Sequence, residues 1–310
     1  MPPQQTSIAD AVKHHMGERG VLVGVVGKST PPRRSTKGNL GFWITLRDES
    51  SPAGLEVGYW HPDAETIWAS LAGENVVVSV RGELQAGKNG SPVLFADQIT
   101  PSDLPPEMFM PQPTLSIEES WGVIQESLSA VRGVLYPLTE WLLQTQGDAF
   151  RRWAAAERYH EPTIGGLAEH TARMLRRAEN DISEYGTPEP YPSRLRAGVI
   201  WHDVGKLWTY GPPPANERLP LERIMGHSLV ACTEVMRGCS ILGLDHWDPD
   251  VKALVHMIAS HHGLPEWGAL VEPRTPEAKA LHVLDLLESR RAHSELTRLS
   301  GIPVDDEMTV

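Results

Sequence analysis

The sequence predicts a protein of two domains, an all-β barrel followed by an all-α domain, and three observations support this. Apolar residues alternate with a period of two between residues 20 and 100, which is typical of strands with one buried face. Five prolines then follow within residues 101–115 and indicate a linker, because proline interrupts both helices and sheets. After residue 115 the apolar spacing changes to steps of three and four, which is typical of helices that pack through one face. The expected division is an N-terminal segment at 1–19, the β domain at 20–100, the linker at 101–115, the α domain at 116–298 and a flexible tail at 299–310.

The composition is that of an ordinary soluble globular protein. Of its 310 residues, 40% are hydrophobic and 22% are charged. No apolar run reaches the roughly 18 residues that a membrane-spanning helix needs, and the first residues lack the basic start and apolar core of a signal peptide. Cys232 and Cys239 stand seven residues apart on one predicted helix and are interpreted as buried thiols. These features predict a reducing, cytoplasmic location.

The net charge of −12 argues against a protein that coats nucleic acid through a generally basic surface. It does not exclude a nucleic-acid enzyme, because bound metal ions can supply positive charge at the site itself.

The β domain is expected to be a five-stranded OB barrel. Three strands, a helix and then a hairpin is the element order of that barrel, and all of them fit within about 80 residues. The expected strands are a first one through Val21, Val23 and Val25, then 42–46, 55–60, 76–80 and 92–95, with a helix at 61–71.

Single-stranded nucleic acid is the expected ligand of this barrel. OB barrels often bind such strands through aromatic residues on strands two and three and through basic residues in loops. Because neighbouring strand residues point to opposite faces, one ring of each aromatic pair is expected in the core, and a solvated turn is an equally good interpretation of the basic loop. The candidate contacts are Phe42, Trp43, Tyr59 and Trp60, with Lys28, Arg33, Arg34 and Lys37 in the loop.

Helices are predicted for the remainder of the chain. Ser116 and Glu119 form a capping-box pattern before an apolar face that runs to Leu135, and Pro137 is expected to break or kink that helix. Thr275 before Pro276 predicts the start of the last helix. The further helices are expected at 149–158, 166–180, 193–204, 221–237, 249–260 and 276–296.

A metal centre is predicted around His202 and Asp203, which stand side by side at the expected end of an apolar helix, with Gly205 as the expected helix stop. A helical bundle builds metal sites from inward side chains of separate helices. Further candidate ligands lie on, or at the end of, other predicted helices: His170, His227, His261, His262 and Asp285.

Five histidines and two aspartates exceed the needs of one hydrated ion, so two divalent ions are expected, with Asp203 between them. Imidazole and carboxylate without thiolate suit Mn²⁺, Fe²⁺, Co²⁺, Ni²⁺ or Mg²⁺. The other histidines are interpreted as ordinary core or surface residues: His14, His15, His61, His246, His256, His282 and His293.

This ordered series resembles the HD phosphohydrolase superfamily, and the added His227 and His261-His262 resemble its two-metal branch. The match narrows to the YhaM-type 3′→5′ exoribonuclease family, which also carries an OB domain and a linker helix before its HD domain. The resemblance therefore covers most of residues 20–292. It is carried by residues 154–160, 165–171, 226–227, 260–263, 275–278 and 281–285.

The sequence departs from this family at three places. Members usually have an acidic residue shortly after the lysine that corresponds to Lys206, where this chain has residues 207–210 without one. Glu288 stands where a second aspartate is common, and Tyr159 stands where a histidine often precedes His160. The departures bear on substrate preference and on the surroundings of the ligands. The chain also lacks a Gly-Tyr-Pro segment after its paired histidines, which weighs against a cyclic-dinucleotide phosphodiesterase.

The resemblance implies a 3′→5′ exonuclease that degrades single-stranded RNA to nucleoside 5′-monophosphates. Single-stranded DNA is a second candidate substrate. Two ions roughly 3.5–4 Å apart would activate a water and clamp the scissile phosphate, with Mn²⁺ the first choice of metal. Asp203 is the expected bridge between the two ions. Lys206 is expected to contact a phosphate oxygen, and the alternative interpretation is an ordinary surface lysine. His160 is expected to be a further metal ligand or a proton donor to the leaving oxygen.

Two alternative functions stay open at this stage. The first is an HD phosphohydrolase acting on free nucleotides, in which the barrel makes contacts in a homo-oligomer. The second is a non-catalytic protein that binds single strands and uses its helical domain only as structure, although packing alone does not call for so many buried histidines.

Overall fold

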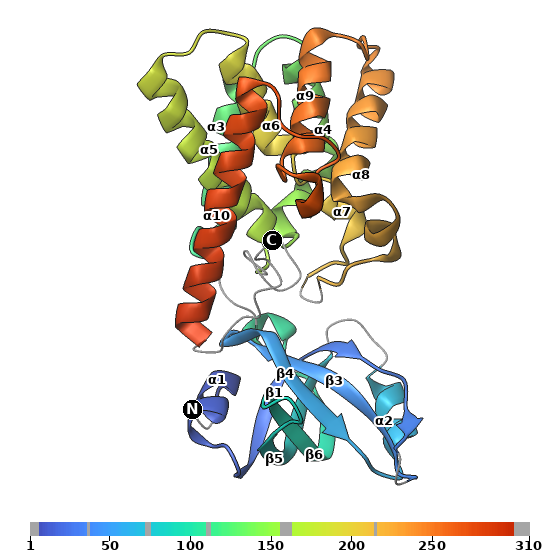
Figure 1. Ribbon diagram of the computed structural model, residues 1–310. Helices are drawn as coiled ribbons and strands as arrows, with labels where there is room; N and C mark the ends of the chain where they lie inside the picture. Colours follow the sequence, from blue (N-terminus) through green and yellow to red (C-terminus); the bar gives the residue numbers. More distant parts are fainter. Residues whose placement is uncertain are drawn as a thin grey trace. The chain divides into compact units, whose positions relative to one another are not determined.

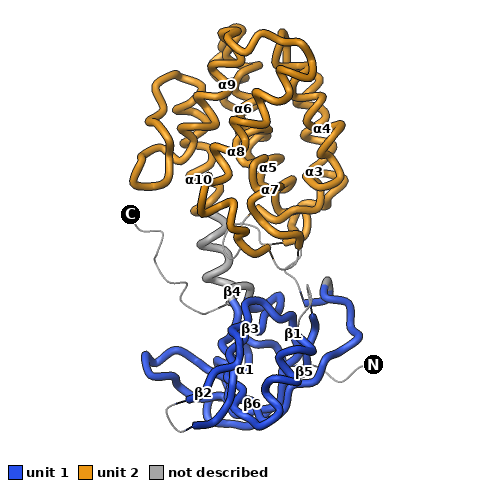
Figure 2. The backbone as a smooth tube through the Cα atoms, turned by 90° about the vertical axis from the view of Figure 1, so that its right-hand side faces the viewer, with its two compact units in different colours: residues 1–112, 295–305 blue, residues 113–294, 306–310 orange. Residues whose placement is uncertain are grey.

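The computed structural model describes residues 6–35, 38–71, 76–109, 113–155, 163–213 and 216–300. The chain divides into two compact units (Figure 2). One comprises residues 1–112 with 295–305, and the other comprises residues 113–294 with 306–310. The strands lie in the first unit, and helices α3 to α9 lie in the second.

The first unit is a closed barrel (Figure 1). Its strands follow the order β1-β5-β6-β4-β3, and β3 pairs again with β1, which closes the sheet. The pairing of β4 with β6 is parallel and the other pairings in the ring are antiparallel. This order confirms the five-stranded OB barrel. The elements are α1 (Ile8–His14), β1 (Arg19–Ser29), β2 (Arg33–Arg34), β3 (Leu40–Asp48), β4 (Ser51–Tyr59), α2 (Ala64–Ser70), β5 (Val77–Ala86), β6 (Pro92–Ser102) and the 3₁₀ helix η1 (Pro106–Phe109).

Alternating side chains fill the barrel. Phe42, Ile44 and Leu46 on β3 all point inward and are buried, as a period of two requires. Helix α1 is attached to the barrel by Asp48, whose carboxylate accepts a hydrogen bond from the Ile8 amide at 2.7 Å.

The second unit is a helical bundle around one large core. Trp201 lies fully buried in that core and donates its indole N–H to the Thr139 hydroxyl at 3.1 Å, so that its polar atom has a partner. None of the described helices is long and apolar enough to cross a membrane. The elements are α3 (Ile117–Ser129), α4 (Leu135–Arg152), α5 (Gly166–Tyr185), α6 (Tyr191–Trp201), α7 (Lys206–Thr209), α8 (Pro220–Leu242), α9 (Pro249–Ser260), the 3₁₀ helix η2 (Pro265–Trp267) and α10 (Pro276–Ser300), which belongs to this unit up to residue 294.

The predicted helix at 149–158 is wrong, because residues 149–152 are the end of the long helix α4. Pro137 does not break a helix as expected. It is the third residue of α4, in the first turn, where backbone N–H groups have no partner within the helix and proline is tolerated. The preceding helix α3 already ends at Ser129, and its start is capped as predicted, with the Ser116 hydroxyl accepting from the Glu119 amide.

Candidate metal centre

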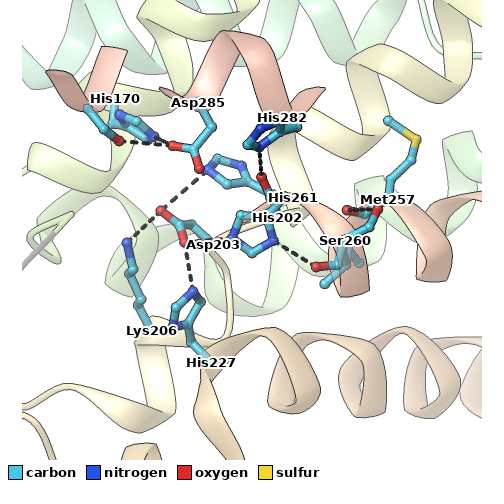
Figure 3. Close-up of polar contacts among 12 residues, drawn as sticks. His170, His202, Asp203, Lys206, His227, Met257, Ser260, His261, His282 and Asp285 are labelled. Carbon is cyan, nitrogen blue, oxygen red and sulfur yellow. Dashed lines mark hydrogen bonds and ion pairs between the residues drawn. The ribbon is translucent and has the colours of Figure 1, made fainter. Parts of the chain in front are cut away.

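Seven side chains from five helical segments meet inside the second unit, and Figure 3 labels all of them except His262. They are the seven candidate ligands of the sequence. His170 lies on the buried face of α5 and Asp285 on α10, while His202 and Asp203 follow the last residue of α6. His227 lies within α8, and His261 and His262 follow the last residue of α9.

The ligand atoms form two clusters. His170, His202 and Asp285 make one, and within it the His170 Nε2 lies 3.3 Å from an Asp285 oxygen. The second cluster consists of three histidines. In each cluster the candidate ligand atoms lie within 4.8 Å of one another, which is compatible with a shared ion. The second cluster contains His227, His261 and His262.

Asp203 lies between the clusters and presents a different oxygen to each. Its Oδ2 is 3.3 Å from the Nε2 of His202, in the first cluster. Its Oδ1 is 3.4 Å from the Nε2 of His227 and 3.8 Å from that of His261, in the second. One carboxylate therefore reaches both groups of ligand atoms.

Three of the histidine rings are oriented so that their lone pairs face this carboxylate. The Nδ1 atoms of His202 and His261 lie 2.8 and 2.7 Å from the carbonyl oxygens of Val199 and Ile258. A carbonyl oxygen can only accept a hydrogen bond, so each Nδ1 carries the proton and each Nε2 is left with its lone pair. His227 is oriented in the same way, because its Nδ1 lies 3.0 Å from a carboxylate oxygen.

This arrangement fits a divalent metal. The buried Nε2 atoms of His202, His227 and His261 have no hydrogen-bond partner, and at 3.3–3.8 Å they face oxygens that also only accept. Buried polar atoms are normally paired, and a cation between two facing acceptors would stabilise both of them. Metal-bound histidines commonly donate their other ring N–H to a carbonyl or carboxylate, as these do.

The charges favour the same conclusion. Burial, together with His262, holds the pKa of His261 well below its usual value, and burial and His227 lower the pKa of His262 to about 4. Burial alone would raise the pKa of Asp203, but Lys206 and His202 outweigh it and hold that pKa well below the ordinary range. At neutral pH His261 and His262 are therefore neutral and Asp203 is ionised, which are the forms that bind metal.

Gly205 is not the helix stop that the sequence predicted. Helix α6 already ends at Trp201, and Gly205 has an ordinary right-handed conformation with φ −59°. A Cβ atom at this position would overlap the carbonyl oxygen of His227. Glycine is required because the start of α7 packs directly against the backbone of α8 at a candidate ligand.

Lys206 is not a surface residue. Its side chain is 12% exposed, and its ammonium lies 2.6 Å from the Oδ2 of Asp203. Burial would lower the pKa of this amine, but the Asp203 carboxylate outweighs burial and raises the pKa above its usual value. Lys206 therefore places a full positive charge beside the central carboxylate.

Two residues outside the predicted set support the centre. The Glu222 carboxylate accepts a hydrogen bond from the His227 Nδ1–H group. The Nδ1 of His282 lies 2.8 Å from the carbonyl oxygen of His261. His282 stands three residues before Asp285, so its place on the same helix was a usable signal. Glu222 offered none, because residues five apart on a regular helix do not face each other.

One departure from the family, Glu288, has a structural role. Glu288 is buried and forms an ion pair with Arg177, which joins α10 to α5. Tyr159 and His160 lie outside the described residues, as does Lys37 in the barrel's basic loop.

The barrel separates the predicted aromatic contacts into two kinds. Phe42 and Tyr59 are 0% and 3% exposed in the core, so their assignment as nucleic-acid contacts is wrong; alternation sends them inward. Trp43 and Trp60 are half-buried on the outer face, with ring centroids 6.1 Å apart in an edge-to-face arrangement. Phe95 on β6, which is 37% exposed, joins them at 6.1 Å from Trp43.

The structure brings part of the basic loop next to these rings. Arg33 pairs with Gly41 in the short β2–β3 ribbon, and a Cβ atom on Gly41 would overlap the ring of Trp60. Arg33 and Arg34 are exposed, and so is Lys28 at the end of β1.

Comparison with known proteins agrees with both units. A model of the HD domain matches residues 167–290. The 3′-5′ exoribonuclease YhaM of Bacillus pumilus is 31% identical over 270 residues, which cover 83% of this chain and 82% of the relative. The proteins of the same name from Listeria welshimeri and Bacillus licheniformis are 29% and 26% identical, over 84% and 89% of this chain and 82% and 87% of theirs.

Among solved structures, asparaginyl-tRNA synthetase from Pyrococcus horikoshii is similar over 46% of this chain and 36% of that one, at 17% identity. Its TM-score of 0.24 is too low to bear on the fold. The sequence relatives span both the barrel and the helical unit with its paired clusters. The chain belongs to the YhaM family of 3′-5′ exoribonucleases.

Proposed function

We propose that this protein is a metal-dependent phosphodiesterase that degrades single-stranded RNA from its 3′ end to nucleoside 5′-monophosphates. The observation that carries the proposal is the Asp203 carboxylate, with one oxygen facing each of two histidine-containing clusters. The substrate and the polarity are supported by the relatives, which are named as 3′-5′ exoribonucleases and are matched over most of their length.

Each cluster would hold one ion. His170, His202 and Asp285 supply the ligands of the first, and the three histidines of the second cluster supply the other, with Asp203 shared. Nitrogen and oxygen ligands without sulfur suit Mn²⁺. Divalent ions bound there would lower the pKa of a bound water and stabilise negative charge on the scissile phosphate.

The chain's own residues position the substrate. Lys206 keeps a positive charge beside Asp203, where it neutralises a non-bridging phosphate oxygen as charge develops. His160 keeps its predicted role as a further ligand or as the proton donor to the leaving oxygen.

The barrel holds the strand. Trp43, Trp60 and Phe95 offer rings on whose faces successive bases stack, and Arg33 and Arg34 contact phosphates beside them. We place this activity in the reducing cytoplasm, which the two free and buried thiols support.

The test is the product pattern on end-labelled single-stranded RNA and DNA with Mn²⁺, Mg²⁺ or EDTA. We expect stepwise shortening from the 3′ end of RNA in Mn²⁺ and none in EDTA. Asp203→Asn keeps the shape but removes the shared charge, so it should lose several kcal/mol of transition-state stabilisation, on the order of a thousandfold in kcat.

Asp148→Asn is the matched control, because that carboxylate is fully exposed on α4 and should leave activity unchanged. Full activity of Asp203→Asn would rule out the shared-carboxylate centre. Hydrolysis of free nucleotides that oligonucleotides fail to inhibit would instead favour a nucleotide phosphohydrolase.

A further inference from the structure

We propose that Glu222 is a positioning residue that fixes His227 as a ligand and so controls the second cluster separately from the first. The inference rests on the proposed function, because it requires that the two clusters bind metal. It begins from a direct contact. The His227 Nδ1 lies 3.0 Å from the Glu222 Oε1, and the two side chains are only 9% and 14% exposed.

The partner of His227 differs in kind from those of the other oriented rings. His202 and His261 donate to backbone carbonyls three residues earlier in the chain, at Val199 and Ile258. Those partners are part of the helix ends themselves and are present whatever the side chains are. His227 depends on a side chain, which a single substitution can remove.

The backbone of α8 makes this contact possible. Gly226 has φ 70° and ψ 150°, which interrupts the helix between Glu222 and His227. Without that interruption, residues five apart would point in different directions. On its other side, the His227 carbonyl packs against Gly205, so the backbone of this ligand is held. The remaining freedom is rotation of the imidazole ring, and Glu222 restricts it.

The consequence is chemical as well as geometric. With Nδ1–H donated to Glu222, the lone pair stays on Nε2, which faces Asp203 at 3.4 Å. A carboxylate in this position also increases the basicity of the ligating nitrogen, and removing such a partner costs roughly 10- to 100-fold in metal affinity. Because His202 is oriented by a carbonyl instead, the loss should be confined to the site that contains His227.

The experiment measures Mn²⁺ binding to the full chain by equilibrium dialysis with elemental analysis. We expect wild type to bind two ions. In Glu222→Ala, one ion should bind as in wild type and the other roughly 10- to 100-fold more weakly. Glu222→Gln keeps an oxygen that can accept from Nδ1, so it should restore most of the lost affinity.

Glu234→Ala is the matched control. Glu234 lies on the same helix, is also 14% exposed and pairs with Arg237. The Glu234→Ala protein should therefore bind both ions normally. A second readout needs no metal: nitrogen NMR of metal-free protein should show the Nδ1–H tautomer of His227 in wild type and Glu222→Gln. That tautomer should be less populated in Glu222→Ala, with circular dichroism confirming the fold of each variant.

Two results would overturn the inference while leaving the proposed function intact. One is wild-type affinity for both ions in Glu222→Ala. The other is an equal loss at both sites, or in both Glu222 variants. Failure of wild type to bind any Mn²⁺ would overturn the proposed function together with the inference.

Discussion

Asp203 is surrounded by Lys206, His202 and His227, which contact its two oxygens at 2.6–3.4 Å. A buried carboxylate is stable only when an opposite charge offsets its lost hydration. Burial keeps the nearby His261 and His262 neutral, since it lowers the pKa of each. Lys206 is therefore a counter-ion of Asp203 in the absence of metal, and bound cations would share that role.

Lys206→Met tests this exchange of counter-ions. In EDTA the variant should lose about 3–5 kcal/mol of unfolding free energy, because one partner of a buried ion pair is removed. In saturating Mn²⁺ the loss should be much smaller, because the ions then balance Asp203. Urea unfolding followed by tryptophan fluorescence measures both values.

Lys252→Met, at an exposed position on α9, is the control and should change stability little in either condition. An equal loss for Lys206→Met with and without Mn²⁺ would show that bound ions do not take over the charge.

At the scale of elements, the interruption of α8 decides where His227 lies. The conformation of Gly226 belongs to a region that glycine alone occupies readily. No atom lies within 4 Å of the position where a Cβ would be added, so space does not require glycine there. The requirement is in the backbone, which must turn to bring Glu222 and His227 together.

Gly226→Ala should therefore destabilise the protein by about 1–3 kcal/mol and also weaken Mn²⁺ binding at one of the two sites. Gly243→Ala is the control, because Gly243 ends the same helix with φ 67° and open space around it. That variant should lose stability without losing metal. Thermal unfolding and equilibrium dialysis measure the two effects, and unchanged metal affinity in Gly226→Ala would contradict the role of the interruption.

At the scale of the whole molecule, the two units carry different chemistry. The barrel presents an aromatic patch of Trp43, Trp60 and Phe95, whereas the helical unit contains the clusters of histidine and aspartate. If the first unit binds the strand and the second cleaves it, damage to the patch should affect long substrates alone.

We expect Phe95→Ala and Trp43→Ala each to weaken the binding of single-stranded RNA by about 1–3 kcal/mol. The effect should appear in the KM for RNA, while kcat on a small phosphodiester such as bis-p-nitrophenyl phosphate stays at the wild-type value. Trp247→Ala removes an exposed tryptophan of the helical unit and should change neither quantity. If kcat on the small substrate also fell, the substitutions would be acting on the metal centre instead of on strand binding.

Much of the architecture follows from the sequence, because it depends on local patterns. The change from a period of two to steps of three and four separates barrel from bundle, and the order of strands and helix predicts barrel closure. The candidate ligands could also be picked out, since five histidines and two aspartates recur on, or at the end of, separate predicted helices. The structure brings all seven of them together.

Contacts between segments far apart in the chain were decided only by the tertiary structure. Alternation along β3 and β4 shows that one ring of each pair is buried, but closure of the barrel selects Phe42 and Tyr59. Gly205 looks like a helix stop until α7 packs against His227, and Glu222 acquires a role only through the interruption of α8. Local periodicity determines which way neighbouring residues point relative to each other, whereas the partner that each one meets depends on packing of the whole chain.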